Sequence, residues 1–211
     1  MFRLVDPQFV PRPEDLGLLQ TALRSKLEKS PAGPSRQGRV NLSARLGEEA
    51  ALALFSPLAQ ANVPVIDANT IRRNHPGFDY LLNGHLRVQV KCSTHYNCVQ
   101  TSFKSDVQTA FDVLLMVDVG CMLDARFGPH RDRPLVSSAA VEYYVVPQSV
   151  VVAFLNSETC IVNGKGRWFY CFRDWVQAEM NPTRDFKGQY FDLHTWRSRW
   201  DVIEDALVRA A

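Results

Sequence analysis

A small set of polar residues in the first half of the chain is of the types that bind a hard cation beside a lysine. Asp79 would supply a carboxylate oxygen, Gln89 an amide oxygen, and Val90 its backbone carbonyl. Glu48 could join through a water molecule or bind a second ion. Oxygen ligands of this kind suit Mg²⁺, which usually keeps several water ligands as well. Lys91 would then orient or deprotonate an attacking water molecule and balance developing charge.

A β-hairpin is predicted to position these side chains. Residues 77–91 form two short strand-like runs joined at Asn83-Gly84, a dipeptide typical of hairpin turns. A strict two-residue turn would pair Asp79 with Val88, which puts Asp79 and Gln89 on opposite faces. A loop of three residues instead pairs Asp79 with Gln89 and puts both on one face. The chemistry therefore requires a three-residue loop or a bulge at this turn.

Helices are predicted before the hairpin and at the end of the chain. Leucines spaced three and four apart predict an amphipathic helix over residues 13–30. Residues 31–41 are predicted to be a flexible basic connector. Ser43 would then cap a second helix that runs to about Gln60, with Leu46, Ala50, Leu54 and Phe55 on one side. Residues 194–211 are typical of a closing helix with Trp196, Trp200, Ile203 and Leu207 facing inward.

Apolar runs predict the strands. Residues 111–119 are almost continuously apolar, which is typical of a strand buried on both faces. Further strands are predicted at 63–67, 141–146 and 168–172, a strand or short helix at 150–155, a polar turn at 71–76, a loop at 92–97, and helices at 99–110 and 174–179. This order of elements indicates an α/β domain with a mixed sheet.

The composition limits the class of protein but does not identify a binding partner. The chain has 211 residues, of which 46% are hydrophobic and 22% charged, enough for one domain with a core and appendages. Its net charge of +2 neither demands nor excludes nucleic acid. The longest apolar run is too short to cross a bilayer, and the amino terminus lacks a signal-peptide layout. Five cysteines without framework spacing suit a reducing compartment, so we expect a cytoplasmic protein.

Taken in order, these residues resemble the motif of the PD-(D/E)XK nuclease superfamily, whose fold is also called restriction-endonuclease-like. The resemblance covers residues 43–152. Its matches are Gly47-Glu48 at a helix start, Phe78-Asp79 on the first hairpin strand, Gln89-Val90-Lys91 on the second, the trailing Ser93-Thr94, and the later strands at 111–119 and 145–147. Two positions depart from the pattern. Phe78 stands where the family usually has proline, and Gln89 replaces the commoner acidic residue, which should weaken metal affinity and shift reliance to Asp79 and Glu48.

The resemblance implies an α/β fold, a restriction-endonuclease-like mixed β-sheet core flanked by helices, over residues 41–155. Residues 1–40 would form an N-terminal arm, helix and linker, and residues 156–211 a C-terminal extension that packs on the core. The implied activity is that of a Mg²⁺-dependent endodeoxyribonuclease, with Mn²⁺ able to substitute and without a nucleotide cofactor. Its catalytic residues would be Glu48, Asp79, Gln89 and Lys91.

Phosphodiester hydrolysis needs a cation that neutralises phosphoryl charge and a water molecule placed for in-line attack. Such an enzyme would act on DNA in restriction, recombination or repair, or in mobile-element biology. Cutting both strands would require a homodimer or two binding events, because one site cuts one strand. Two alternatives are a catalytically weak or inactive nucleic-acid-binding module of the same fold and a structure-specific junction resolvase.

Two other sets of residues could bind ligands. Lys104, Arg126, Arg131 and Arg133 could contact DNA phosphates, which require only cations, although a solvated loop explains them equally well. Cys92, His95 and Cys98 have a spacing that suggests zinc, but a clear fourth ligand is lacking. Ordinary loop cysteines are the preferred interpretation of that run.

Overall fold

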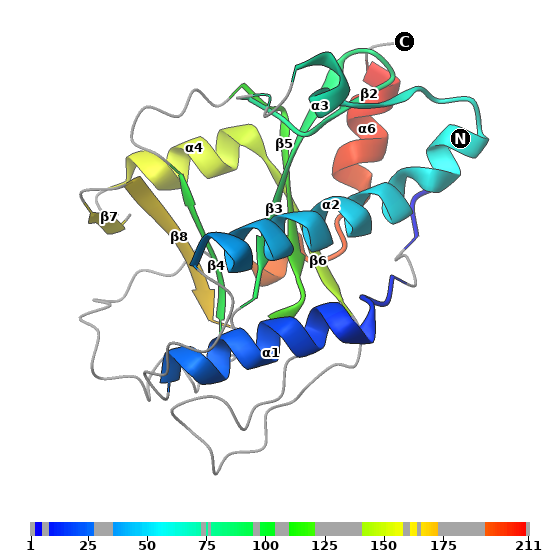
Figure 1. Ribbon diagram of the computed structural model, residues 1–211. Coiled ribbons are helices and arrows are strands. Elements are labelled where there is room, and N and C mark those ends of the chain that lie inside the picture. The colour runs from blue at the N-terminus through cyan, green and yellow to red at the C-terminus, as the bar shows by residue number, and fades with distance from the viewer. Residues whose placement is uncertain are drawn as a thin grey trace.

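Two β-sheets and a set of helices make up the part of the chain that the computed structural model describes, residues 3–5, 9–27, 36–72, 75, 77–94, 98–103, 110–120, 141–157, 161–163, 166–172 and 193–209 (Figure 1). The elements are α1 (Pro13–Leu27), α2 (Arg36–Gln60), β1 (Val65–Asp67), α3 (Ala68–Ile71), β2 (Tyr80–Leu82), β3 (Leu86–Ser93), β4 (Cys98–Phe103), β5 (Val113–Asp118), β6 (Glu142–Pro147), α4 (Gln148–Asn156), β7 (Ile161–Asn163), β8 (Gly166–Phe172), the 3-10 helix η3 (His194–Trp196) and α6 (Asp201–Arg209). The predicted α/β class with a mixed sheet is confirmed.

The main sheet has the order β1-β2-β3-β5-β6. Neighbouring strands are antiparallel except β3 and β5, which are parallel. All six residues of β5 are buried, and the first five alternate between two apolar clusters. Val113, Leu115 and Val117 belong to the cluster that α1, α2 and α6 cover, whereas Leu114 and Met116 face the cluster that includes α4. The prediction of a strand buried on both faces is therefore confirmed.

Helix α2 packs closely against β3. Its predicted inward side is buried, namely Leu46, Ala50, Leu54 and Phe55. A Cβ atom built on Gly47 would lie 2.9 Å from the Cβ of Cys92 and 3.5 Å from Cγ1 of Val90. Only a glycine leaves room for this approach, which brings the first half of α2 down onto the second half of β3.

Helix α2 begins at Arg36, seven residues before the predicted cap, so the Ser43 cap is wrong and the expected connector is wrong over residues 36–41; residues 31–35 lie outside the described part of the chain. Ser43 lies inside the helix, where its hydroxyl donates to the carbonyl of Val40 at 3.0 Å. A Gln37–Asn41 hydrogen bond of 2.7 Å, one turn apart, supports the early start. Leu42 also packs against the core, so tertiary contact stabilises the helix in this polar segment.

The region after the hairpin departs most from the sequence-based expectation. Residues 92–97 were expected to be a loop, but β3 continues to Ser93. The helix expected at 99–110 is wrong over its first part, because residues 98–103 form β4, which pairs with β8 in the second sheet. The order of that sheet is β4-β8-β7. A strand whose partner lies far away along the chain leaves little local signal.

Three smaller differences concern helices. The expected strand at 63–67 begins at Val65, and the short helix α3 follows it; this helix was not predicted and overlaps the turn expected at 71–76 only at Ile71. Residues 150–155, predicted as strand or helix, lie in α4. The closing helix is divided into η3 and α6; Trp200, Ile203 and Leu207 are buried as predicted, whereas Trp196 is half-buried against the other cluster. The helix expected at 174–179 lies outside the described residues.

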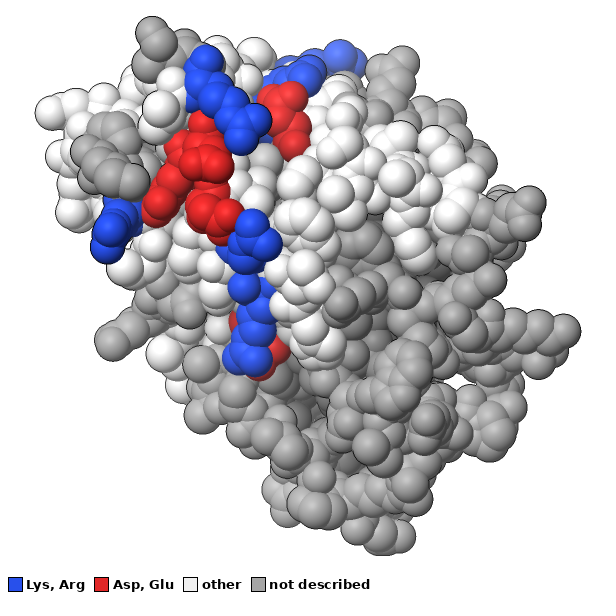
Figure 2. Space-filling view, turned by 180° about the vertical axis from the view of Figure 1, so that it is seen from behind, with Lys and Arg blue, Asp and Glu red and all other residues white. Residues whose placement is uncertain are grey.

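Both ends of the described chain contribute to one core. Leu4 and Leu19 share a cluster with Ile203 and Leu207, and the backbone N–H of Leu4 donates to the Glu204 carboxylate. The face seen from behind carries basic and acidic side chains side by side over α6, where Arg199 pairs with Asp201 (Figure 2). Among the helices in the described ranges, none has both the length and the apolar character needed to span a bilayer.

Candidate active site

The β2–β3 hairpin has the register that the chemistry requires. Tyr80 pairs with Val88 and Leu82 with Leu86, which leaves three residues, 83–85, between the paired strand ends. Continuing this register puts Asp79, just before β2, opposite Gln89, and the Asp79 N–H donates to the Val88 carbonyl at 2.9 Å. Asn83 and Gly84 both have positive φ, 49° and 72°, a conformation that asparagine and glycine tolerate well. These φ values and the 3.2 Å hydrogen bond from the His85 N–H to the Leu82 carbonyl are those of a two-residue turn, and His85 is the extra residue of a bulge beside it. The predicted register is therefore confirmed, and it is reached through a bulge.

The carboxylate of Asp79 is held by the opposite strand. The backbone N–H of Val90 donates to Asp79 Oδ2 at 2.6 Å, and the side-chain amide of Gln89 donates to the same oxygen. The amide nitrogen of Gln89 also lies 3.2 Å from the carbonyl oxygen of Val90, to which it donates. Val88 and Val90 point into the core under α2, so strand alternation places Gln89 and Lys91 together on the other face. Asp79, Gln89 and the Val90 carbonyl therefore converge as predicted.

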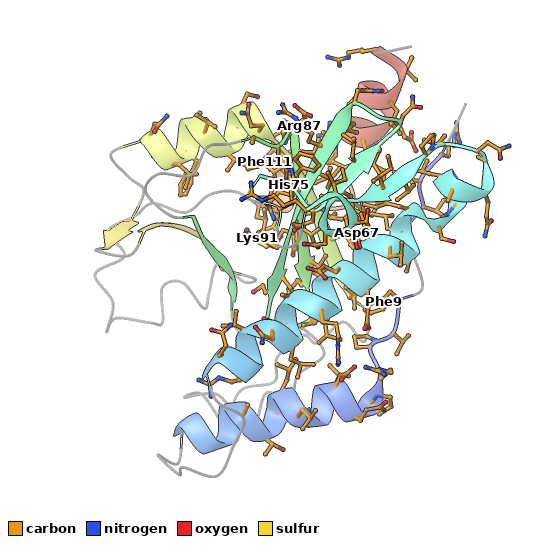
Figure 3. All side chains as sticks on the ribbon, turned by 45° about the horizontal axis from the view of Figure 1, so that its top comes forward. Phe9, Asp67, His75, Arg87, Lys91 and Phe111 are labelled. Atoms are coloured by element: carbon orange, nitrogen blue, oxygen red, sulfur yellow. The ribbon has the colours of Figure 1, made fainter. Side chains whose placement is uncertain are left out.

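Charged neighbours act on Asp79 in both directions. Burial raises the pKa of Asp79, and the Val90 N–H and the positive charge of Lys91 lower it. The negative charge of Asp67 raises this pKa and His75 lowers it; the net change is upward. The charges of Lys91, Asp67 and His75 thus all act on this one carboxylate, and Figure 3 labels the three side chains.

Glu48 approaches the same carboxylates from α2. Burial raises the pKa of Glu48, and the negative charges of Asp79 and Asp67 raise it further. Its backbone carbonyl accepts a 3.0 Å hydrogen bond from the hydroxyl of Tyr80, the residue that follows Asp79 on β2. This bond and the close contact of Gly47 with β3 fix the position of Glu48 relative to the hairpin. Glu49, its neighbour, instead pairs with Arg45 at 3.5 Å.

Asp67 and His75 were not predicted as site residues. Asp67 ends β1 opposite Tyr80, and its side chain accepts the N–H of Asn69 at the start of α3. His75 packs against Phe78 with ring centroids 4.2 Å apart and ring planes tilted by 49°. The sequence places Asp67 at the end of an apolar run, but only the antiparallel pairing of β1 with β2 brings it beside Asp79. For His75 the local sequence carries no signal beyond its nearness to the hairpin.

The donor set fits a hard cation rather than a soft one. In the described part of the chain, no three His, Cys, Asp or Glu side chains are grouped so that they could hold a metal ion. A Mg²⁺ ion would thus have to bind Asp79 with the Val90 carbonyl, the Gln89 amide oxygen and water, and Glu48 would join directly or through water. Mg²⁺ accepts such mixed sets because it keeps water ligands and binds substrate phosphates.

Several predicted ligands lie outside the described residues. These are the phosphate-contacting candidates Lys104, Arg126, Arg131 and Arg133, together with His95 of the zinc alternative. Cys92 is half-buried beside Gly47, and the side chain of Cys98 is not among those described. The DNA contacts and the zinc alternative therefore stay predictions.

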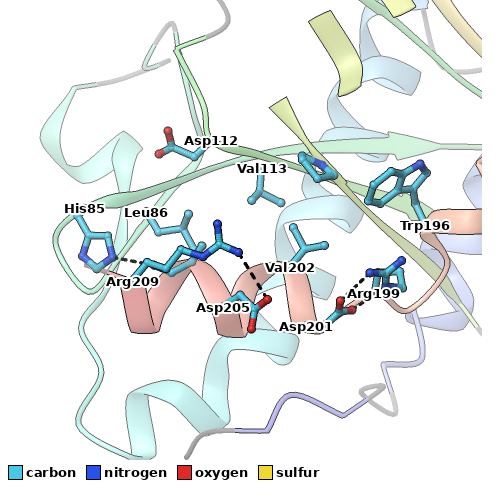
Figure 4. Close-up of a pocket in the computed structure, with 12 residues that line it drawn as sticks. His85, Leu86, Asp112, Val113, Trp196, Arg199, Asp201, Val202, Asp205 and Arg209 are labelled. Carbon is cyan, nitrogen blue, oxygen red and sulfur yellow. Dashed lines mark hydrogen bonds and ion pairs between the residues drawn. The ribbon is translucent and has the colours of Figure 1, made fainter. Parts of the chain in front are cut away.

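A pocket with a cavity volume of about 600 Å³ lies elsewhere, between α6 and the strand ends where β3 and β5 begin (Figure 4). It is lined by His85, Trp196 and several charged residues that already have partners. Arg199 pairs with Asp201 at 2.7 Å, and Arg209 lies 3.7 Å from Asp205. None of the carboxylates around Asp79 lines this pocket. This pocket is therefore separate from the candidate site.

Comparisons of the chain with protein-family models, with curated proteins and with solved structures found no match.

Proposed function

We propose that this protein is a metal-dependent endonuclease that hydrolyses DNA phosphodiester bonds. The observation that supports the proposal best is the register of the β2–β3 hairpin, which sets Asp79 opposite Gln89 with Lys91 on the same face. A strand register that differed by one residue would separate these side chains. The residue types and their order resemble the superfamily motif except at Phe78 and Gln89, and the oxygen donors suit Mg²⁺ or Mn²⁺.

The roles of the residues follow from their surroundings. Asp79 and the Val90 carbonyl would hold the cation, which supplies neutralisation of phosphoryl charge. Glu48 would bind a water ligand, or take part directly, from the neighbouring helix. Lys91, whose positive charge acts on Asp79, would orient the attacking water molecule and stabilise charge on the phosphate. Cutting both strands would need two copies of the site, so we expect a homodimer or successive binding events.

One observation favours the alternative of a nucleic-acid-binding module without turnover. Oδ2 of Asp79 already accepts two N–H groups, from Val90 and Gln89, and Gln89 removes a negative charge that most superfamily members place here. A cation must compete with the Gln89 amide, and in this alternative the metal affinity is too low for efficient catalysis.

The test is cleavage of plasmid DNA and of branched DNA with Mg²⁺ or Mn²⁺. Lys91→Ala and Asp79→Ala should each reduce the rate by at least about 100-fold, the usual contribution of a group that activates water or stabilises charge. Glu48→Gln should reduce it as well. Glu49→Gln is the matched control, because Glu49 pairs with Arg45 and should be dispensable.

The outcomes separate the candidates. Discrete fragments from linear or supercoiled DNA support the endonuclease, and selective cleavage of branched DNA would indicate a junction resolvase. DNA binding that depends on salt, without cleavage of any substrate, would support the binding module. Cleavage that survives Lys91→Ala would show that the active site lies elsewhere.

A further inference from the structure

The amide nitrogen of Gln89 occupies the place between two oxygens that a cation would use. It donates to Oδ2 of Asp79 and, at 3.2 Å, to the carbonyl of Val90. A primary amide nitrogen carries two hydrogens, so it can satisfy two converging acceptors at once. A carboxylate oxygen and a carbonyl oxygen that point at one spot are also what a hard divalent cation prefers. The nitrogen and a cation cannot share that spot.

The orientation of the amide follows from the charges around it. If the amide were turned by a half-rotation, Oε1 would face the Asp79 carboxylate and the Val90 carbonyl, and three acceptors would meet without a donor. Such an arrangement costs free energy unless a cation lies among them. With a cation there, the turned amide is the favourable one, because Oε1 becomes a ligand.

We propose that Gln89 is a two-state positioning residue: its amide nitrogen holds Asp79 and the Val90 carbonyl together when no cation is bound, and a divalent cation binds only as the amide turns to offer Oε1. A glutamate at this position would lack the first state, because it has no donor. Gln89 therefore lowers the affinity for the cation but keeps the site assembled without it. The statement about cation binding rests on the proposed function, whereas the statement about the amide without a cation does not.

The first experiment measures thermal unfolding after removal of metal with EDTA. Gln89→Glu should lower the melting temperature by roughly 3–8 °C, because two carboxylates then face each other and the Val90 carbonyl loses its donor. The double variant Asp79→Asn with Gln89→Glu moves the amide to the other strand and should recover most of the loss. The asparagine side chain introduced just before β2 can accept from the Val90 N–H and donate to the carboxylate introduced on β3. Gln37→Glu is the control: Gln37 is an exposed amide paired with Asn41, and its replacement should change little.

The second experiment adds Mg²⁺ or Mn²⁺. The melting temperature should rise more for Gln89→Glu than for the wild type, because a tighter ligand stabilises more at the same concentration. A second measurement uses the wild-type protein alone and so does not depend on whether a variant folds. The side-chain NH₂ signals of Gln89 in an NMR spectrum should shift on addition of Mg²⁺, while those of Gln37 should not.

Negative results would distinguish a failure of this inference from a failure of the proposed function. If Gln89→Glu is as stable as the wild type in EDTA, or the double variant recovers nothing, the amide does not hold the two oxygens and the inference is wrong. An equal response of both proteins to the cation, or an unchanged Gln89 signal, would overturn the inference and leave the proposed function intact. If neither protein responds to Mg²⁺ or Mn²⁺, both the inference and the metal dependence of the proposed function fail.

Discussion

At Asp79, burial and hydrogen bonding act on one carboxylate in opposite directions. Burial raises its pKa above the ordinary value of 3.8, and the Val90 N–H and Lys91 offset only part of that effect. Two further carboxylates, Asp67 and Glu48, lie within reach of its charge, and burial raises the pKa of Glu48 as well. Gathering acidic groups where their ionisation is disfavoured costs stability, and such an arrangement is typical of sites kept for function.

Replacement of Asp79 by asparagine should therefore stabilise the protein at neutral pH while it abolishes cleavage. A carboxyl with a raised folded-state pKa binds protons more tightly when folded, so the wild type loses stability as pH rises from 3.8 through that pKa. The asparagine side chain does not titrate. The advantage of Asp79→Asn should consequently be largest near neutral pH and shrink as pH falls.

Urea unfolding between about pH 4 and pH 8 would measure this difference. Asp205→Asn, at an exposed carboxylate on α6, is the control and should show little change. A stability loss for Asp79→Asn at neutral pH would contradict the expectation, because the bonds to Asp79 would then outweigh the cost of its burial.

At the scale of elements, the site depends on how closely α2 lies on β3. The contact is possible because Gly47 has no side chain where it meets Cys92 and Val90. The hydroxyl of Tyr80 then ties β2 to the carbonyl of Glu48. Two strands therefore fix the position of Glu48: β3, which contacts the preceding Gly47, and β2, whose Tyr80 bonds to the Glu48 carbonyl. The Gly-Glu pair in the sequence thus has a packing explanation as well as a chemical one.

Gly47→Ala should destabilise the protein by about 1–2 kcal/mol. The new Cβ would lie 2.9 Å from the Cβ of Cys92, so helix and strand must move apart, and this overpacking exceeds the gain in helix propensity. Gly17→Ala is the matched control, since nothing lies within 4 Å of its added Cβ in α1. That variant should gain about 0.5–1 kcal/mol.

The free energies of unfolding in urea compare the two variants directly. We expect opposite signs. If both alanines stabilise the protein, α2 and β3 are not in the close contact on which the position of Glu48 depends.

At the scale of the whole molecule, the helices at both ends of the chain close the same core. Leu19 from α1 and Ile203 and Leu207 from α6 share an apolar cluster with the strands of the main sheet. Trp200 packs against Tyr143 of β6, with ring centroids 5.6 Å apart. The face of the sheet that α1, α2 and α6 cover is therefore one packed unit, and the candidate site depends on it through α2 and β3.

Ile203→Ala should destabilise the entire described fold by about 2–5 kcal/mol, because Ile203 is fully buried and a cavity would remain. Val208→Ala, at a residue that is 68% exposed on the same helix, should change stability by less than about 0.5 kcal/mol. Tryptophan fluorescence and circular dichroism should report one common transition for both variants. Separate transitions would show that α6 unfolds independently of the sheet.

Local patterns in the sequence determined a large part of this structure. The spacing of leucines predicted α1, the apolar spacing of α2 identified the buried side of that helix, and the continuous apolar run of β5 identified a strand with two buried faces. Asn83-Gly84 located the hairpin turn. The register with three residues between the paired strand ends was deduced from the chemistry rather than from the turn itself, because the dipeptide alone favours a shorter connection. These features depend on contacts between residues close in sequence or on the period of a single element.

Only the tertiary structure decided the rest. β4 is a strand because β8 pairs with it, and α2 begins early because Leu42 reaches the core. Asp67 joins the site because β1 lies beside β2, and Glu48 reaches it because Gly47 lets α2 approach β3. Such pairings join residues distant in the chain, and their free energy comes from surfaces that exist only once the sheet has formed. The residue types of the candidate site can thus be found in the sequence, whereas their convergence around Asp79 is a property of the fold.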